Sequence, residues 1–330
     1  AGSISAAVRL GICVEEGRGV PADPSRAAAL YRDAATQGDA LGMTNLARCL
    51  MEGIGVDADP AAARHWLEQA IRTGNLPWAH FLLARILAAT DPHGTERLDH
   101  LRTAAEAGLV PAAEELGGTL LHGPEAVRDP VAARDILGFA VASGSALAAY
   151  HLGVCARDGL GGPVDAEAAV AFLRTAAEGG IHDAQVAYGE CLIAGIGQAA
   201  DPAAALPWFR LGAAEGHLPS ILALADAAER GVGQDVDPVV AKRWYQRAAA
   251  TGTPRGRRAC AAFLLRSGTL ADPVEALRLL SLAAEDGDVR AAADLARLLG
   301  EGAPGVDPDP LAAARWAAHA AQGGLDGSAD

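Results

Sequence analysis

Apolar residues recur along the chain with the spacing of one helical face, in short segments separated by turns. After Gly38, for example, Leu46 and Leu50 stand four residues apart, which places both on one stripe of a helix. Later segments repeat this pair as Leu82 and Ile86, Leu116 and Leu120, Tyr188 and Leu192, and Leu295 and Leu299. The period-two alternation that is typical of strands is hard to find. The pattern therefore predicts an all-α protein.

The turns recur at intervals of 34 to 37 residues, each marked by a glycine: Gly38, Gly74, Gly108, Gly144, Gly180, Gly216, Gly252, Gly287 and Gly324. Fifteen residues earlier an aspartate usually precedes a proline, as in Asp23-Pro24 and Asp201-Pro202. Aspartate is a good N-cap, proline fits the first helical turn, and glycine ends a helix. A fixed period of this length indicates a repeat architecture. It predicts one repeat domain, 1–330, with nine helix-turn-helix units at 1–38, 39–74, 75–108, 109–144, 145–180, 181–216, 217–252, 253–287 and 288–324, and a tail at 325–330.

Gly-x-Gly strings, such as Gly53-Ile54-Gly55 and Gly231-Val232-Gly233, join the two predicted helices of a unit. A dinucleotide site needs a strand before such a string and a third glycine that opens the next helix. Here a helix precedes the string, and the string recurs from unit to unit. We interpret these glycines as turn residues with positive φ.

The combined pattern resembles the Sel-1-like repeat family, a relative of the tetratricopeptide repeat. Leu10-Gly11 through Gly17-Arg18-Gly19-Val20 matches the first half of its repeat, and Trp208-Phe209 through Gly216 matches the second. The resemblance implies a right-handed superhelical solenoid that scaffolds other proteins. The third unit departs from the pattern, since Ala89 replaces a turn glycine, His93-Gly94 replaces the acidic cap, and His100 stands at the usual tryptophan position.

Aromatic residues recur at the tryptophan position of the second helix of the repeat, and we expect them to form the core between repeats: Trp66, Phe172, Trp208, Trp244 and Trp316. Four cysteines share another position, in the first helix: Cys13, Cys49, Cys155 and Cys191. Helix axes 8–10 Å apart hold such cysteines beyond disulfide reach, so we expect reduced thiols. This favours a reducing, cytoplasmic location, with the periplasm as the alternative if a signal peptide has been removed.

The net charge of −14 and the single lysine, Lys242, disfavour nucleic acid and anionic lipid as partners. No apolar run is long enough for membrane insertion. A zinc site could be imagined from His151, Cys155, His182 and Cys191, but it lacks the tight pairs of known sites. We therefore predict no metal, no cofactor, no catalytic residues and no enzymatic activity. The arginine- and alanine-rich composition is compatible with a bacterial source.

Two sets of residues are candidates for binding a partner. The first lies on the exposed stripe of the first helices, which is expected to line a concave groove, and includes Asn45, Arg48, His151, Glu190, Asp226 and Arg297. The second is the one dense basic run, formed by Arg255, Arg257, Arg258 and Arg266 with Arg243, Arg247 and Lys242 nearby. Arginine suits carboxylates because its planar fork matches their geometry.

These features predict a non-enzymatic adaptor that holds a protein or peptide in its groove. Two alternatives stay open: an envelope-associated repeat protein that binds glycan or secretion machinery, and the regulatory repeat region of a larger enzyme. Neither end carries a distinctly polar capping helix, although the terminal repeats of a solenoid need one for solubility. We therefore expect either a longer native chain or end-to-end self-association.

Overall fold

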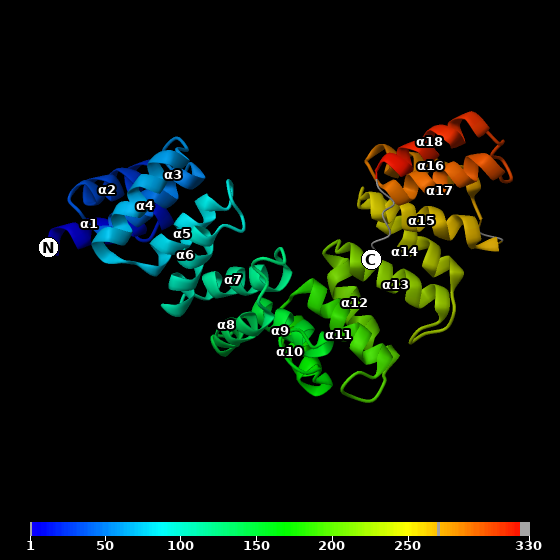
Figure 1. The fold of residues 1–330 in the computed structure, drawn as a ribbon, viewed down its shortest axis with the longest axis horizontal. Coiled ribbons are helices and arrows are strands. Elements are labelled where there is room, and N and C mark those ends of the chain that lie inside the picture. The colour runs from blue at the N-terminus through cyan, green and yellow to red at the C-terminus, as the bar shows by residue number, and fades with distance from the viewer. Residues whose placement is uncertain (1, 269–270, 324–330) are drawn as a thin grey trace. The chain divides into compact units, whose positions relative to one another are not determined.

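The computed structural model describes residues 2–268 and 271–323, which fold into 18 α-helices (Figure 1). These residues contain no β-strand, only an isolated bridge between Ala303 and Val306. Within residues 2–164 and within residues 165–323, each helix packs against the next one in the chain. The predicted all-α solenoid of about nine helix-turn-helix repeats is confirmed. The expected last stop, Gly324, and the tail 325–330 lie outside the described residues.

The helices fall into two compact units, Ala1–Val164 and Asp165–Asp330. The first unit holds α1 (Gly2–Glu16), α2 (Pro24–Thr36), α3 (Ala40–Glu52), α4 (Pro60–Gly74), α5 (Pro77–Leu87), α6 (Thr95–Glu106), α7 (Val110–His122), α8 (Pro130–Ala142) and α9 (Ala146–Asp158). The second holds α10 (Ala166–Glu178), α11 (His182–Ala194), α12 (Pro202–Ala214), α13 (Leu218–Arg230), α14 (Pro238–Ala250), α15 (Pro254–Arg266), α16 (Pro273–Glu285), α17 (Val289–Glu301) and α18 (Pro310–Gln322). Odd-numbered helices are the first helices of their pairs, and even-numbered helices are the second.

The predicted helix starts are seen in detail at the aspartate caps. The side chain of Asp201 accepts a hydrogen bond from the Ala204 amide at 3.1 Å, which satisfies one of the free N–H groups of the first turn. Most of the expected closing glycines have positive φ. The expected stop at Gly74 is wrong, because α4 includes this glycine and Asn75 adopts the left-handed conformation instead, with φ 47°. Asparagine tolerates this conformation better than other non-glycine residues do.

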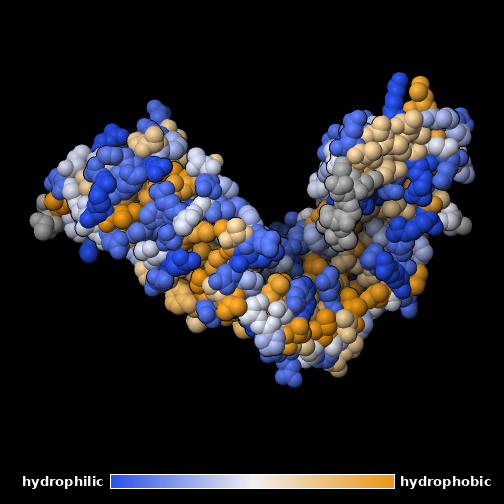
Figure 2. Space-filling model, viewed as in Figure 1, coloured by the Kyte–Doolittle hydropathy of each residue, from blue (hydrophilic) through white to orange (hydrophobic). Residues whose placement is uncertain are grey.

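The core between repeats is centred one residue away from the tryptophan position. Trp208 and Trp244 are only half-buried, whereas the next residues, Phe209 and Tyr245, are buried. The same offset recurs along the second helices, where the buried residues are Tyr31, Leu67, Leu101, Leu137, Leu173 and Leu280. The expectation that the tryptophan position forms the core is therefore corrected, because those rings lie at the edge of the core. Hydrophobic (orange) side chains accordingly reach the surface among hydrophilic (blue) ones on the face that Figure 2 shows.

The glycine of the Leu-Gly motif makes room for this buried residue. A Cβ on Gly189 would lie 2.3 Å from the ring of Phe209, and one on Gly11 would lie 2.6 Å from Tyr31. Separations below 3 Å are not tolerated between carbon atoms, so a side chain here would push the two helices of the pair apart. The motif thus sets how closely the first and second helices approach.

In the Gly-x-Gly turns that follow an earlier repeat, such as those of Gly55 and Gly233, the second glycine is required for two reasons. Gly233 has a φ of 68°, and a Cβ there would lie 2.3 Å from the carbonyl oxygen of Pro202, at the start of α12. Gly55 meets Pro24 at the start of α2 in the same way. These turns therefore pack each repeat against the second helix of the repeat before it. Their positive φ values confirm that the glycines of the Gly-x-Gly strings are turn residues.

The irregular third unit is held by polar contacts in place of the usual motif. His80 Nδ1 lies 2.8 Å from His100 Nδ1, and His80 Nε2 lies 2.7 Å from Asn75 Oδ1. Because Asn75 Oδ1 can only accept, Nε2 of His80 carries the proton and its Nδ1 accepts from His100. Burial, together with the neighbouring ring, lowers the pKa of His80 and keeps it neutral.

Candidate partner-binding groove

The first helices of successive pairs contact one another in the second unit, α11 with α13 and α13 with α15. Across them lies a pocket of about 430 Å³, lined by Val186, Glu190, Pro219, Leu222, Ala223, Asp226, Tyr245, Arg255, Ala259, Ala262 and Arg266. We refer to this pocket as the C-terminal groove. It brings together four residues that the sequence predicted from two separate sets: Glu190, Asp226, Arg255 and Arg266.

The C-terminal groove has an apolar floor between side walls of opposite charge. Leu222 and Ala259 on the floor are half-buried, which leaves apolar surface that a ligand could cover. Glu190 on α11 and Arg255 on α15 are exposed, and neither makes a hydrogen bond or ion pair with any residue that the structure describes. Both charges are therefore available to a ligand.

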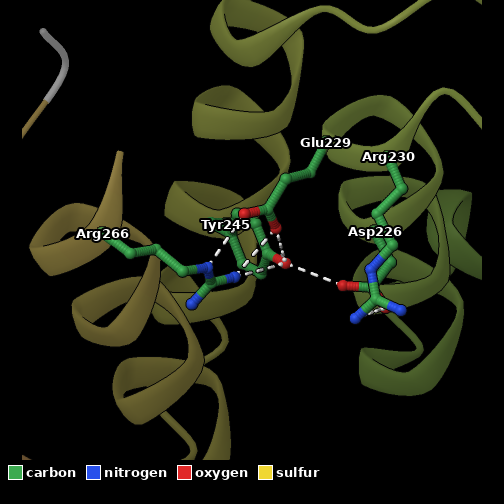
Figure 3. A network of polar contacts seen from close by, with 5 residues as sticks. All are labelled: Asp226, Glu229, Arg230, Tyr245 and Arg266. Carbon is green, nitrogen blue, oxygen red and sulfur yellow. Dashed lines mark hydrogen bonds and ion pairs between the residues drawn. The ribbon is translucent and has the colours of Figure 1, made fainter. Parts of the chain in front are cut away.

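The wall between α13 and α15 is a fixed polar network (Figure 3). Arg266 donates to both carboxylate oxygens of Glu229, at 2.9 and 2.8 Å, and its guanidinium lies over the Tyr245 ring, 5.7 Å from the centroid. The Tyr245 hydroxyl lies 2.7 Å from Glu229 Oε2 and 2.9 Å from Asp226 Oδ1, and Asp226 also pairs with Arg230. We call Arg266, Glu229 and Tyr245 the α15 clamp.

The α15 clamp joins three helices of two successive pairs, since Glu229 lies on α13, Tyr245 on α14 and Arg266 on α15. Hydrogen bonds from Arg266 outweigh the effect of burial and hold the pKa of Glu229 below its ordinary value. Burial, followed by the contacts to Glu229 and Asp226, raises the pKa of Tyr245 and keeps the hydroxyl protonated. Arg266 is thus engaged within the protein, whereas Arg255 is not.

The same clamp occurs at the start of the chain, where Arg48 of α3 binds Glu15 of α1 and Glu15 accepts from Tyr31 of α2. Arg48 Nη2 lies 2.7 and 2.6 Å from the two Glu15 oxygens, and the tyrosine bond is 2.8 Å. Burial raises the pKa of Glu15, but the hydrogen bonds from Arg48 and Tyr31 prevail and lower it. The structure therefore places Arg48, predicted as a groove residue, in a contact between repeats.

The arginines of the basic run are not gathered on one surface. Arg257 pairs with Asp286, and Arg258 Nε donates to Asp288 at 3.0 Å. Arg257 lines a different pocket, next to α14 and α16, and not the C-terminal groove. Arg243, on α14, is exposed and forms no ion pair with any residue that the structure describes.

Three other candidates lie away from the C-terminal groove. Arg297 pairs at 3.2 Å with Asp294, on its own helix, and Asn45 is half-buried with its Nδ2 unpaired. His151 lies in the first unit, in a pocket of about 620 Å³ that is also lined by Phe81 of α5, Leu147 of α9 and several residues of α7. Burial, with His122 nearby, lowers the pKa of His151.

Sequence reasoning missed two features of these surfaces. Trp78 is 49% exposed at the start of α5 and packs edge-on against Phe81. The sequence could have indicated this exposure, because Trp78 does not occupy the position in the repeat that the other tryptophans share. The clamp tyrosines were also missed; they stand at the buried position of the second helix, where a hydroxyl needs a partner.

The described residues contain no group of three or more potential ligands that could hold a metal ion, and no helix among them is long and apolar enough to cross a membrane. None of the five cysteines forms a disulfide in the part of the chain that the structure describes; four are buried, while Cys13 is half-buried. Burial raises the pKa of Cys49 and of Cys260 to about 11. Neither thiol is set up as a nucleophile, because the thiolate is the reactive form.

The fold defines a class of protein, an α-helical repeat solenoid built from successive helix pairs. Comparison with known families identifies it further. The Sel1 repeat model matches residues 4–39, 40–75, 146–181, 182–217, 219–252, 258–288 and 289–325. The chain belongs to the Sel1 repeat family. The unmatched stretch contains the irregular third unit and the unit after it.

Two solved structures are similar over most of their lengths. A protective antigen of uropathogenic Escherichia coli with an SLR fold is 27% identical, with a TM-score of 0.74, and the match covers 97% of this chain and 69% of that one. A Sel1 repeat protein from Oxalobacter formigenes is 26% identical, with a TM-score of 0.68, covering 90% and 88%. No curated protein sequence matched significantly. The family supports a protein-interaction scaffold.

Proposed function

We propose that this protein is a non-catalytic adaptor that holds a segment of a partner protein in the C-terminal groove. The observation that carries the proposal is the apolar floor bordered by two unpaired charges, Glu190 and Arg255. Apolar side chains that face water between two charges do not stabilise a helix face that only contacts solvent. A bound peptide segment would cover these side chains and remove them from water. The α15 clamp fixes one wall, so little ordering is needed on binding.

The proposal is tested by blocking the groove. Ala223, on the floor, is changed to arginine, and the control variant carries the same change at Ala203, an exposed residue of α12. Each protein is used as bait in a lysate of its source, after circular dichroism has shown equal helicity. We expect a stoichiometric partner with the parent and with Ala203→Arg, and its loss with Ala223→Arg. Equal capture by both variants would contradict the groove.

A second candidate function follows from Trp78. An exposed aromatic ring beside a pocket is the usual platform for a sugar ring, and the pocket at Phe81 and Leu147 lies in the same unit. The envelope alternative, glycan binding, would use this surface and not the C-terminal groove. Binding to a glycan array that is abolished by Trp78→Ala and unaffected by Ala223→Arg would favour it over the adaptor.

A further inference from the structure

The two unpaired charges of the C-terminal groove lie at opposite sides of its floor. Glu190 belongs to α11 and Arg255 to α15, and α13 lies between these helices in the order of contacts. Asp226, on α13, adds a second carboxylate beside the floor. The other basic residue, Arg266, is held by Glu229. The groove therefore has one acidic side and one basic side, and only Arg255 offers a free cation.

The separation of the two charges sets the length of a ligand that reaches both. First helices packed 8–10 Å apart put α11 and α15 roughly 16–20 Å apart. Glu190 is the ninth residue of α11 and Arg255 the second of α15, a further offset of about 10 Å along the helices. The diagonal is roughly 20 Å, which an extended segment spans with about six residues.

From this arrangement we infer that the groove selects an extended peptide segment that carries a carboxylate and a cationic side chain about six residues apart, with small or apolar residues between them. The carboxylate meets Arg255, the cation meets Glu190 and Asp226, and the intervening residues cover Leu222, Ala223 and Ala259. The inference rests on the proposed function and adds the charge order of the partner. Opposed charges fix direction as well as register, because a reversed segment places like charges together.

The experiment uses a displayed library of random 12-residue peptides, selected on the full chain. The test variant exchanges the two charges, Glu190→Arg with Arg255→Glu. The control exchanges two exposed charges away from the groove, Glu285→Arg with Arg210→Glu, so the net charge is the same in all three proteins. None of these four residues has a bonded partner in the part of the chain that the structure describes, so each variant is expected to fold. Circular dichroism and thermal melting check this.

We expect the parent and the control to enrich peptides with the same order of acidic and basic residues, and the exchanged variant to enrich the opposite order. A parent-selected peptide should bind the exchanged variant about tenfold more weakly by fluorescence anisotropy at low salt, with a smaller difference at 0.5 M salt. Converting the acidic side chain of the peptide to its amide, and separately amidating its C terminus, identifies which carboxylate meets Arg255.

The experiment distinguishes failure of the charge-order inference from failure of the proposed adaptor function. If all three proteins select the same peptides without a charge pattern, and Ala223→Arg blocks them, the groove binds peptide but the charge inference is wrong. If selected peptides bind equally well to Ala223→Arg, or if the parent selects none, the proposed function is contradicted as well. Charge-patterned peptides that ignore the exchange would also overturn the inference, since their charges would contact other residues.

Discussion

Replacing Arg266 with alanine is expected to destabilise the protein by about 1.5 kcal/mol. The side chain makes two charged hydrogen bonds to Glu229 and covers the rings of Tyr245 and Phe263, with centroid distances of 5.7 and 5.8 Å. A buried charged hydrogen bond contributes about 1.5–3 kcal/mol and an exposed ion pair about 0–1. Because Arg266 is 48% exposed and Glu229 22%, a value between these limits is expected.

The matched control is Arg278→Ala. Arg278 also binds a glutamate through two hydrogen bonds, at 2.8 and 2.7 Å, but its partner, Glu275, lies three residues away on the same helix. The loss of this exposed pair should cost less than about 0.5 kcal/mol. The comparison therefore separates a contact that joins repeats from an equally well-formed contact within one helix.

The contribution of the α15 clamp should depend on pH with a definite sign. The pKa of Glu229 is lowered in the folded protein, so the unfolded chain binds a proton at higher pH than the folded one. The stabilisation is complete above the ordinary glutamate pKa and is lost as the pH falls through the lowered, folded value. The difference between the parent and Arg266→Ala should accordingly be full at pH 7 and shrink toward zero in acid.

Urea unfolding followed by circular dichroism measures these differences, with the midpoint compared at unchanged slope. The reasoning is refuted if Arg266→Ala and Arg278→Ala are equally stable at pH 7. It is also refuted if the Arg266→Ala difference persists below the pH at which Glu229 protonates, because the stabilisation would then come from the ring contacts and not from the ion pair.

Three further outcomes are expected. Gly233→Ala should cost more than about 2 kcal/mol in urea unfolding, since its φ of 68° and its approach to Pro202 both exclude a side chain; a neutral result would show that the turn adapts. Gly138→Ala should stabilise by about 0.5–1 kcal/mol, because this glycine lies inside α8 with open space around its Cα, and a loss of stability would mean that the space is occupied. Cys49 and Cys260, whose pKa values burial raises to about 11, should react with a thiol reagent at pH 8 only after unfolding; fast reaction in the native protein would argue against their burial.

Several residues of the C-terminal groove could be predicted from residue type and register. Which charged residues stay unpaired in the groove could not be predicted in this way. Glu190 and Asp226 were found by register, because a helix of known period exposes known positions, and Arg255 was found as part of the dense basic run. Which arginines stay free could not be found in this way. Arg255 and Arg257 are two residues apart, yet Arg257 meets Asp286, 29 residues later in the chain, whereas Arg255 meets no carboxylate among the described residues.

The sequence by itself determined the repeat, its length and its helix boundaries, because these depend on local chemistry: aspartate caps, glycine stops and the helical spacing of leucine and alanine. Asn75 shows the limit even there, since a residue that tolerates positive φ took the place of the expected glycine. Only the tertiary structure decided that Phe209, and not Trp208, fills the core, and that Arg48 and Arg266 join repeats. Each of these outcomes depends on the angle between neighbouring helices and on partners from 16 to 37 residues away, which a local pattern does not encode.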